Sequence, residues 1–247
     1  MNPGQTGKPP SRRPGAATAQ ETQPISPGLH GRRRGKKLRA HHAALLSTVL
    51  PSLSFDPSLP IPDPACLFAP KPAALWLEIG FGGGEHLAAQ AHAHPEIGYI
   101  GCEAFLNGIA KALALIEMGR LRNVRLYNGD ARAVIDALPN EALDGAYLLY
   151  PDPWPKRRHH KRRFLSDETL AALARTLRPG GELRFATDID ANAGWSLARV
   201  LRSPDFVWAP AGPRDWQTPW DGWAGTRYEA KALHSGRRPS YLTFRRK

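Results

Sequence analysis

Cysteine is scarce in this chain of 247 residues, which contains only Cys66 and Cys102. The sequence has no CxxC pair and no histidine group with metal-ligand spacing, so we expect neither a disulfide framework nor a zinc site. No apolar run approaches the roughly 18 residues of a membrane span, and the N-terminus lacks the apolar core of a secretory signal. These absences predict a cytoplasmic protein that holds no metal and does not enter a membrane.

Acidic residues are also few. Lys and Arg number 34 against 22 Asp and Glu, which gives a formal charge of +12 at pH 7 and a pI near 10.2. This excess of positive charge predicts a polyanionic partner, because each phosphate that a protein neutralises releases condensed counterions. Nucleic acid is the first expectation and an anionic membrane surface the second.

The N-terminal part of the chain divides in two. Residues 1–30 hold six Pro and four Gly with almost no large apolar side chains, which predicts a disordered arm. Residues 31–72 form a basic and Pro-rich lead-in. Its cluster "GRRRGKKLRAHH" at 31–42 is either a solvated tail or a contact for a phosphate backbone, and seven prolines within 51–72 predict an irregular segment.

From residue 73 to residue 247, short apolar runs alternate with helical stretches, which is typical of parallel strands that helices cross and cover. We expect helix 166–181 to begin after the N-cap candidate Ser166 and to end on a glycine pair. This α/β pattern places the carboxyl ends of the strands on one edge of a sheet, where ligands bind. The predicted strands cover 74–80, 98–104, 123–130, 143–151 and 182–188, with an antiparallel closing pair at 206–210 and 240–246; the other predicted helices cover 85–94, 108–119, 131–138 and 193–203.

A glycine-rich turn, "LEIGFGGGEHL", places Gly80 and Gly82 directly after the first predicted strand. Glycines there let the backbone turn sharply and approach a ligand that a Cβ would repel, although a turn without any ligand is the plain alternative. A dinucleotide site needs a small residue at the third position of G-x-G-x-x-G, where this chain has Glu85. The turn therefore favours a nucleoside without phosphates.

Carboxylates stand near the ends of the first three predicted strands. Glu103 ends the second strand, where it can accept both ribose hydroxyls of a nucleoside. Asp130 ends the third, where it can bond an adenine amino group, cap the following helix, or do both. S-adenosylmethionine suits such a pocket, because its ammonium and sulfonium groups match Glu78 and the other acids.

The fourth predicted strand runs into "LLYPDPWPKRRHHKRR", which joins one carboxylate between two prolines to a strip of Lys, Arg and His. The flanking prolines stiffen the backbone that presents Asp152, and Trp154 offers a flat face for a base. The alternative is a proline-rich turn with a packing Trp. Six cations from Lys156 to Arg163 form either a solvated loop or an RNA-backbone clamp, and their place beside a methyl donor favours the clamp.

Six segments, "LEIGFGGG", "GCEA", "NGDA", "YPDPWPKRRHHKRR", "LRPGGELRFATD" and "TRYEAKA", occur in the order in which the bacterial tRNA (guanine-N7)-methyltransferase family has them. From about residue 31 to its end, the chain resembles that family. The resemblance implies a Rossmann-like class I fold whose seven-stranded sheet is mostly parallel with the last strand antiparallel. It also implies transfer of a methyl group from S-adenosylmethionine to N7 of guanine 46 in the variable loop of tRNA.

The resemblance also assigns roles to residues, with Asp152 as the catalytic residue. Pro155 stands where many members have His, and the stretch between Asp188 and Thr226 is rich in Trp and Pro. From the residues alone, Thr226, Tyr228 and Glu229 indicate only a turn and the start of a strand. The family's cofactor residues fall on Glu78, Glu103, Asp130 and Asp152, to which the glycine turn adds Gly80 and Gly82; its tRNA-binding residues fall on Lys156, Asp188, Thr226, Arg227, Tyr228 and Glu229.

Methylation of guanine N7 needs no general base, because this nitrogen carries a lone pair and no proton. Asp152, Asp188 or Glu229 can instead stabilise the positive charge that develops on the purine, or grip the guanine edge. Two alternatives stay open: a methyltransferase for another RNA or DNA base nitrogen, and a non-catalytic RNA-binding protein on the same scaffold. We expect a monomer or a weak homodimer.

Overall fold

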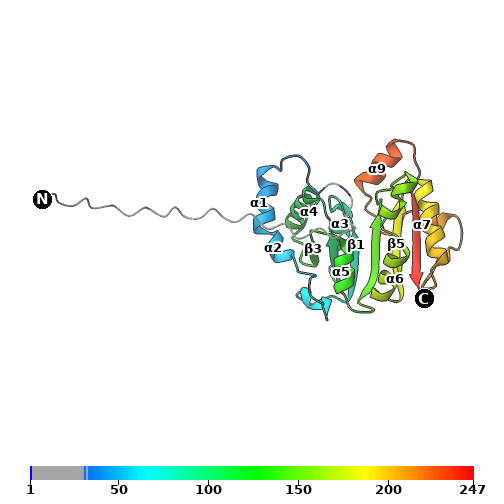
Figure 1. The fold of residues 1–247 in the computed structure, drawn as a ribbon, viewed down its shortest axis with the longest axis horizontal. Coiled ribbons are helices and arrows are strands. Elements are labelled where there is room, and N and C mark those ends of the chain that lie inside the picture. The colour runs from blue at the N-terminus through cyan, green and yellow to red at the C-terminus, as the bar shows by residue number, and fades with distance from the viewer. Residues whose placement is uncertain (2–30, 32) are drawn as a thin grey trace.

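The structure is a computed structural model that describes residues 1, 31 and 33–247. The arm predicted for residues 1–30 lies, apart from Met1, outside the described residues. The described chain folds around one seven-stranded sheet with helices on both faces (Figure 1).

The sheet has the order β3-β2-β1-β4-β5-β7-β6. Strands β1 to β5 pair parallel, whereas β7 pairs antiparallel with both β5 and β6. Six strands therefore run in one direction and β7 in the other, which confirms the predicted fold class. The strands are β1 (Ala74–Ile79), β2 (Ile97–Cys102), β3 (Val124–Tyr127), β4 (Leu143–Leu149), β5 (Leu177–Thr187), β6 (Phe206–Val207) and β7 (Ser240–Arg246).

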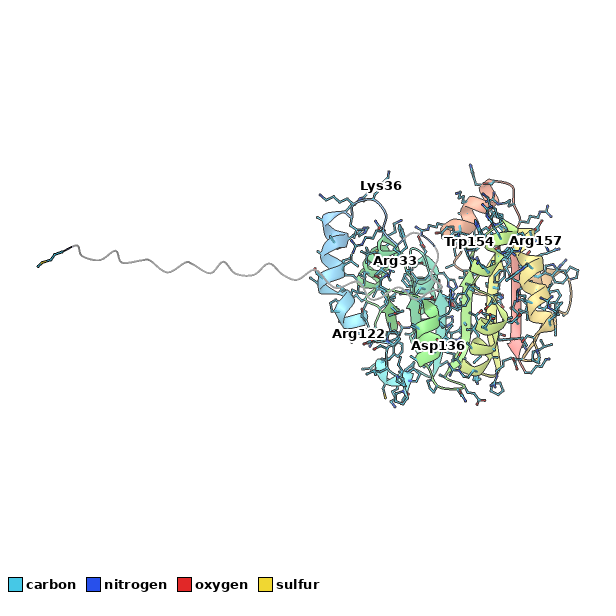
Figure 2. All side chains as sticks on the ribbon, in the orientation of Figure 1. Arg33, Lys36, Arg122, Asp136, Trp154 and Arg157 are labelled. Atoms are coloured by element: carbon cyan, nitrogen blue, oxygen red, sulfur yellow. The ribbon has the colours of Figure 1, made fainter. Side chains whose placement is uncertain are left out.

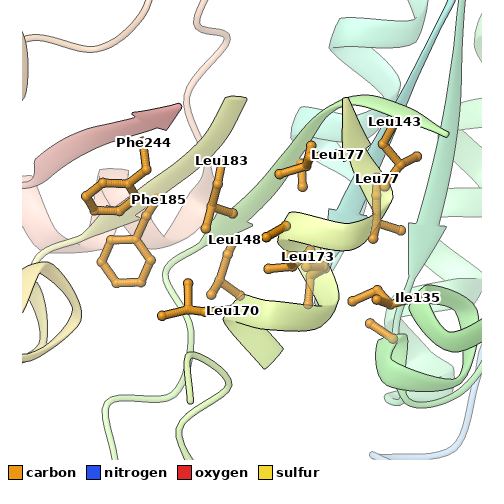
Figure 3. Close-up of a cluster of buried hydrophobic side chains, with 14 of the residues drawn as sticks. Leu77, Ile135, Leu143, Leu148, Leu170, Leu173, Leu177, Leu183, Phe185 and Phe244 are labelled. Carbon is orange, nitrogen blue, oxygen red and sulfur yellow. The ribbon is translucent and has the colours of Figure 1, made fainter. Parts of the chain in front are cut away.

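Side chains that alternate along the strands build two hydrophobic clusters, one on each face of the sheet. On β4, Leu148 belongs to the first cluster and Tyr147 to the second. Figure 3 shows the first cluster, in which Leu77 and Leu148 of the sheet lie with Leu173 of α6. The helices are α1 (Ala40–Thr48), α2 (Leu50–Leu53), α3 (Glu85–Ala93), α4 (Leu106–Gly119), α5 (Ala131–Ala137), α6 (Asp167–Thr176), α7 (Asp190–Arg202), α8 (Arg214–Gln217) and α9 (Arg227–His234), with 3-10 turns η1 (Pro64–Leu67) and η2 (Arg157–Arg162).

The reversed direction of β7 decides what stands at the ligand edge of the sheet. Because β7 runs against its neighbours, its first residue, Ser240, lies at the edge where the other strands end. Helix α9 precedes β7 in the chain and therefore also lies at that edge (Figure 1). The C-terminal part of the chain is thus brought to the strand ends that carry Glu103 and Asp152.

The predicted end of helix 166–181 is wrong. Helix α6 begins after Ser166, whose side chain accepts a hydrogen bond from the N–H of Thr169, but it ends at Thr176, and β5 starts at Leu177. Pro179 explains the early end: proline has no N–H to continue a helix and disfavours the helical conformation of the residue before it.

The lead-in is more structured than its prolines predicted. Residues 51–72 were expected to be irregular, yet α2 and η1 fall within or across this range, each with a proline in its first turn, where no N–H is needed. Helix α1 packs on α4, and Leu45 and Leu53 are buried in the second cluster. Within the described residues, no helix is long and apolar enough to cross a membrane.

Replacing Leu45 tests whether this lead-in belongs to the folded core. Leu45→Ala removes a side chain that is 3% exposed, and we expect it to lower the free energy of unfolding by about 2 to 5 kcal/mol. Leu59→Ala is the matched control: Leu59 is 70% exposed, so its replacement should change stability by less than about 0.5 kcal/mol. Urea unfolding followed by circular dichroism measures both; equal stabilities would show that α1 adds nothing to the core.

Candidate active site

A pocket of about 380 Å³ opens at the carboxyl ends of β1, β2 and β4. Four kinds of segment line it: the loops after the strands, the N-terminal basic segment, the turn that carries Asp152, and the start of α9. The sequence-predicted residues on its wall are Gly80, Gly82, Glu103, Asp130, Asp152, Trp154, Arg162, Arg227 and Tyr228.

The glycine turn between β1 and α3 forms one wall of the pocket. Gly80 has a φ of +70°, and no heavy atom lies within 4 Å of the point where its Cβ would stand. Gly82 has a φ of +62°, and a Cβ there would lie 3.1 Å from Nη2 of Arg227. Both positions need the left-handed conformation that glycine adopts without strain. The turn therefore exposes main chain to the pocket at Gly80, while α9 covers it at Gly82.

Glu103 is held by the backbone of the two strand ends that it joins. Its Oε2 accepts a hydrogen bond from the N–H of Gly82 at 2.7 Å, and its Oε1 accepts one from the N–H of Phe105 at 2.8 Å. Burial raises the pKa of the Glu103 carboxyl, and these backbone hydrogen bonds counteract that effect. Each oxygen keeps a second lone pair, so the fixed carboxylate can still accept hydrogen bonds from a ligand.

Asp130 has one occupied and one vacant carboxylate oxygen. Its Oδ1 accepts hydrogen bonds from the N–H of Arg132 at 3.1 Å and from Nε of the same residue at 3.3 Å, so Asp130 caps α5. Its Oδ2 is buried and has no hydrogen-bond partner in the described part of the chain. A buried acceptor without a partner is costly, so this oxygen in the pocket wall suits a ligand N–H.

Glu78 is not among the residues that line the pocket. The carboxylate is 2% exposed, and its Oε2 lies 2.8 Å from Nδ1 of His86, on the first turn of α3. The imidazole also packs against Tyr147 and Trp223, with ring centroids 4.6 Å and 4.9 Å away. This contact thus joins β1 to α3 across the glycine turn. Nothing in the sequence analysis identified His86 as a partner of Glu78, and the cofactor contact of Glu78 stays a prediction.

The turn after β4 presents the exposed Asp152 at the pocket edge, between half-buried neighbours. Tyr150 and Trp154, two residues before and after it, have φ angles of +49° and +41°. Residues other than glycine rarely adopt this region, and each instance costs about 1 to 3 kcal/mol. The surroundings of the turn must therefore hold it in place, and on the β4 side the N–H of Tyr150 donates to the carbonyl of Ala186 at 2.7 Å.

The basic strip lies beside this turn and includes η2. Lys156, Arg157, Arg158 and Lys161 are exposed, and the guanidinium carbon of Arg162 lies 5.0 Å from the ring centroid of Trp154. Figure 2 shows Trp154 and Arg157 at the same edge of the molecule as Lys36. Arg163 differs from the expected clamp, since its side chain is buried and donates to the carbonyl of Pro153.

Thr226 and Glu229 begin a helix, so the expectation of a turn and a strand start there is wrong. Oγ1 of Thr226 accepts from the N–H of Glu229 at 3.0 Å, and Oε2 of Glu229 accepts from the N–H of Thr226 at 3.3 Å. This reciprocal pair is the capping box that the spacing T-x-x-E encodes. Glu229 is buried and also accepts hydrogen bonds from Nε1 of Trp223 and the hydroxyl of Tyr241.

Thr226 and Glu229 do not line the pocket, and neither do Asp188 and Lys156, which were also predicted to bind tRNA. Asp188, just after β5, accepts a hydrogen bond from Nε of Arg237 at 2.7 Å, and Lys156 is exposed on the strip. The pocket therefore brings together the predicted cofactor residues apart from Glu78, with Arg227 and Tyr228 added. The tRNA roles of Lys156, Asp188, Thr226 and Glu229 stay predictions.

The N-terminal basic segment closes one side of the pocket, a contact for which the basic cluster was the only sign. The carbonyl of Arg33 accepts a hydrogen bond from the N–H of Leu106 at 2.9 Å. The side chain of Asn107 makes two further hydrogen bonds to the segment: its Oδ1 accepts from the N–H of Gly35 at 2.7 Å, and its Nδ2 donates to the carbonyl of Lys36 at 2.8 Å. These bonds fix the segment to the start of α4 and place Arg33 on the pocket wall.

Comparison with solved structures supports the fold. The crystal structure of the 16S rRNA methyltransferase KamB aligns with a TM-score of 0.52 at 18% identity, over 71% of this chain and 89% of that one. At this identity the likeness concerns the architecture alone.

Sequence comparisons find relatives of much higher identity than the solved structure. A family model described as "Putative methyltransferase" matches residues 72–240. The tRNA (guanine-N(7)-)-methyltransferase of Rhodopseudomonas palustris strain BisB5 is 55% identical over 217 residues, covering 87% of this chain and 85% of the relative. The protein of the same name from strain BisA53 is 51% identical over 231 residues, covering 93% and 92%. With more than half of the aligned residues identical over nearly the whole length, this chain belongs to the tRNA (guanine-N(7)-)-methyltransferase family.

Proposed function

We propose that this protein transfers the methyl group of S-adenosylmethionine to N7 of guanine 46 in the variable loop of tRNA. The observation that carries the proposal is the composition of the pocket. Glycine backbone, two fixed carboxylates and a third at the edge meet beside an exposed basic strip. The relatives' name supports the same reaction.

The pocket residues fit the cofactor. Glu103 offers lone pairs on a fixed carboxylate for the ribose hydroxyls, and the vacant Oδ2 of Asp130 suits the amino group of adenine. Gly80 leaves open space where a side chain would block the methionine portion. When bound, S-adenosylmethionine supplies an electrophilic methyl group carried on a sulfonium ion.

Three carboxylates, those of Asp152, Asp188 and Glu229, are candidates for stabilising or gripping the guanine. Glu229 is buried and accepts hydrogen bonds from several donors, among them Nε1 of Trp223, and Asp188 forms an ion pair with Arg237. Both carboxylates are therefore already bonded within the protein. Asp152 is the exposed carboxylate on the pocket wall. No base is needed at N7, so we assign Asp152 to stabilising the purine as it becomes cationic, in a geometry set by the rigid turn.

The tRNA approaches this edge over two basic elements. Lys156, Arg157, Arg158 and Lys161 are exposed on one side of the pocket, and Arg33 and Lys36 on the other. Phosphate contacts position a nucleic acid, whereas the pocket reads a base that is splayed out of its stack. A tRNA partner fits the pI near 10.2, and we place the reaction in the cytoplasm.

The first test is nucleoside mass spectrometry of tRNA incubated with labelled S-adenosylmethionine. We expect labelled 7-methylguanosine from the wild type and a kcat about a hundredfold lower from Asp152→Asn, which removes the charge and keeps the shape. Label on another nucleoside would identify a different base nitrogen as the target. Cofactor and tRNA binding without any label would favour the non-catalytic RNA-binding protein.

A second test concerns Asp130. Asp130→Asn keeps a residue that caps helices well but removes the charged acceptor, so we expect cofactor affinity, measured by calorimetry, to fall about 10- to 100-fold. Asp136→Asn is the matched control, because Asp136 is exposed on the same helix and absent from the pocket wall (Figure 2). Equal affinities of the two variants would remove Asp130 from the cofactor site.

A further inference from the structure

Arg163 is the buried cation of the basic strip. It is 7% exposed, whereas Arg157 and Arg158 are exposed. Its Nε–H donates to the carbonyl oxygen of Pro153 at 2.8 Å, and its Nη1 has no hydrogen-bond partner among the described residues. Removing a guanidinium from water is costly, so the contacts that keep Arg163 inside must compensate for its lost hydration.

Besides the bond to Pro153, Trp195 of α7 provides a second compensating contact. The guanidinium carbon of Arg163 lies 4.8 Å from the Trp195 ring centroid, and that of Arg199 lies 4.5 Å from it. Arg199 is itself held by Asp167, with Nη1 and Oδ1 2.5 Å apart. A cation over an indole face is attracted by the ring quadrupole, and more strongly when water is excluded. Helix α7 thus provides a fixed aromatic platform under the end of the basic strip.

The bond to Pro153 acts on a strained part of the Asp152 turn. The carbonyl of Pro153 shares a peptide plane with the nitrogen of Trp154, and the Trp154 φ of +41° measures the rotation next to that plane. A bond that holds this carbonyl therefore also holds the peptide plane to which the Trp154 φ angle refers. On the other side of Asp152, the Tyr150 N–H is bonded to Ala186. The turn is consequently tied at both ends, once to the sheet and once to Arg163.

We propose that Arg163 is a positioning residue: it holds the Pro153 carbonyl against α7 through Trp195 and thereby keeps Asp152 at the pocket edge, and it does not contact tRNA phosphate. The basic strip then has two functions, an inner anchor at Arg163 and outer cations that face the solvent. The consequence for methyl transfer rests on the proposed function. The ordering of the turn does not.

Hydrogen exchange of the protein without substrates tests the ordering directly. Arg163→Lys keeps the charge but loses the planar group that donates to Pro153 and stacks on Trp195. We expect the amide of Tyr150, whose hydrogen bond to the carbonyl of Ala186 holds the other end of the turn, to exchange about 10- to 100-fold faster in this variant. Arg158→Ala is the matched control: it removes an exposed cation of the same strip and should leave this exchange unchanged.

Kinetics with tRNA separate positioning from phosphate binding. We expect Arg163→Lys to lower kcat about 10- to 100-fold, with KM for tRNA and its salt dependence unchanged. Arg158→Ala should instead raise KM and reduce the slope of log KM against log salt by about one. Trp195→Leu removes the platform and should reproduce the exchange and kcat effects, which keeps the test valid if Arg163→Lys does not fold.

Two results would overturn the proposal: exchange and kcat of Arg163→Lys equal to those of the wild type, or a rise in KM with a changed salt slope like that of Arg158→Ala. A wild type that forms no 7-methylguanosine would contradict the proposed function instead. In that case faster exchange in Arg163→Lys would still support the anchoring of the turn.

Discussion

The hydrogen bond from the Gly82 N–H to the Glu103 carboxylate joins the loops at the ends of β1 and β2, and much of the site depends on it. It occupies one lone pair of the carboxylate and holds the glycine turn against the neighbouring strand. Partial burial raises the pKa of the Glu103 carboxyl, and the backbone donors counteract that effect. The same donors fix the carboxylate in space, so this part of the pocket has its shape before any ligand arrives.

The same arrangement recurs around the pocket: a side chain or carbonyl at the pocket is fixed by a hydrogen bond from another residue. Asp130 is fixed by the helix that it caps, and Asn107 fixes the basic segment through both the oxygen and the nitrogen of its amide. Arg163 does the same for the turn at Pro153. Carboxylates and arginines share the pocket wall, and backbone N–H groups hold Glu103 and Asp130 in place. Most cations of the strip remain in solvent, where a polyanion can reach them.

Periodicity and turn chemistry were enough to predict the strand order along the chain and the residues at each strand end, because these follow from local sequence. They failed where a distant contact decides the outcome. Nothing near Glu78 identifies His86 as its partner, and nothing within the basic strip marks Arg163 as the buried cation, since Trp195 lies 32 positions further along. The helix at Thr226 was a different kind of error, because its capping box is a local signal that could have been read from T-x-x-E.

The reversed β7 also separates the two ends of the described fold. Residues 31 and 33 lie on the pocket wall, whereas β7 starts at the pocket edge and carries the chain away from it, so that the C-terminus stands at the opposite edge of the sheet (Figure 1). An affinity tag or fluorescent label attached after Lys247 would thus project away from the pocket edge of the sheet. One attached close to residue 31 would crowd the entrance, which makes the C-terminus the better handle for immobilising the protein on a surface.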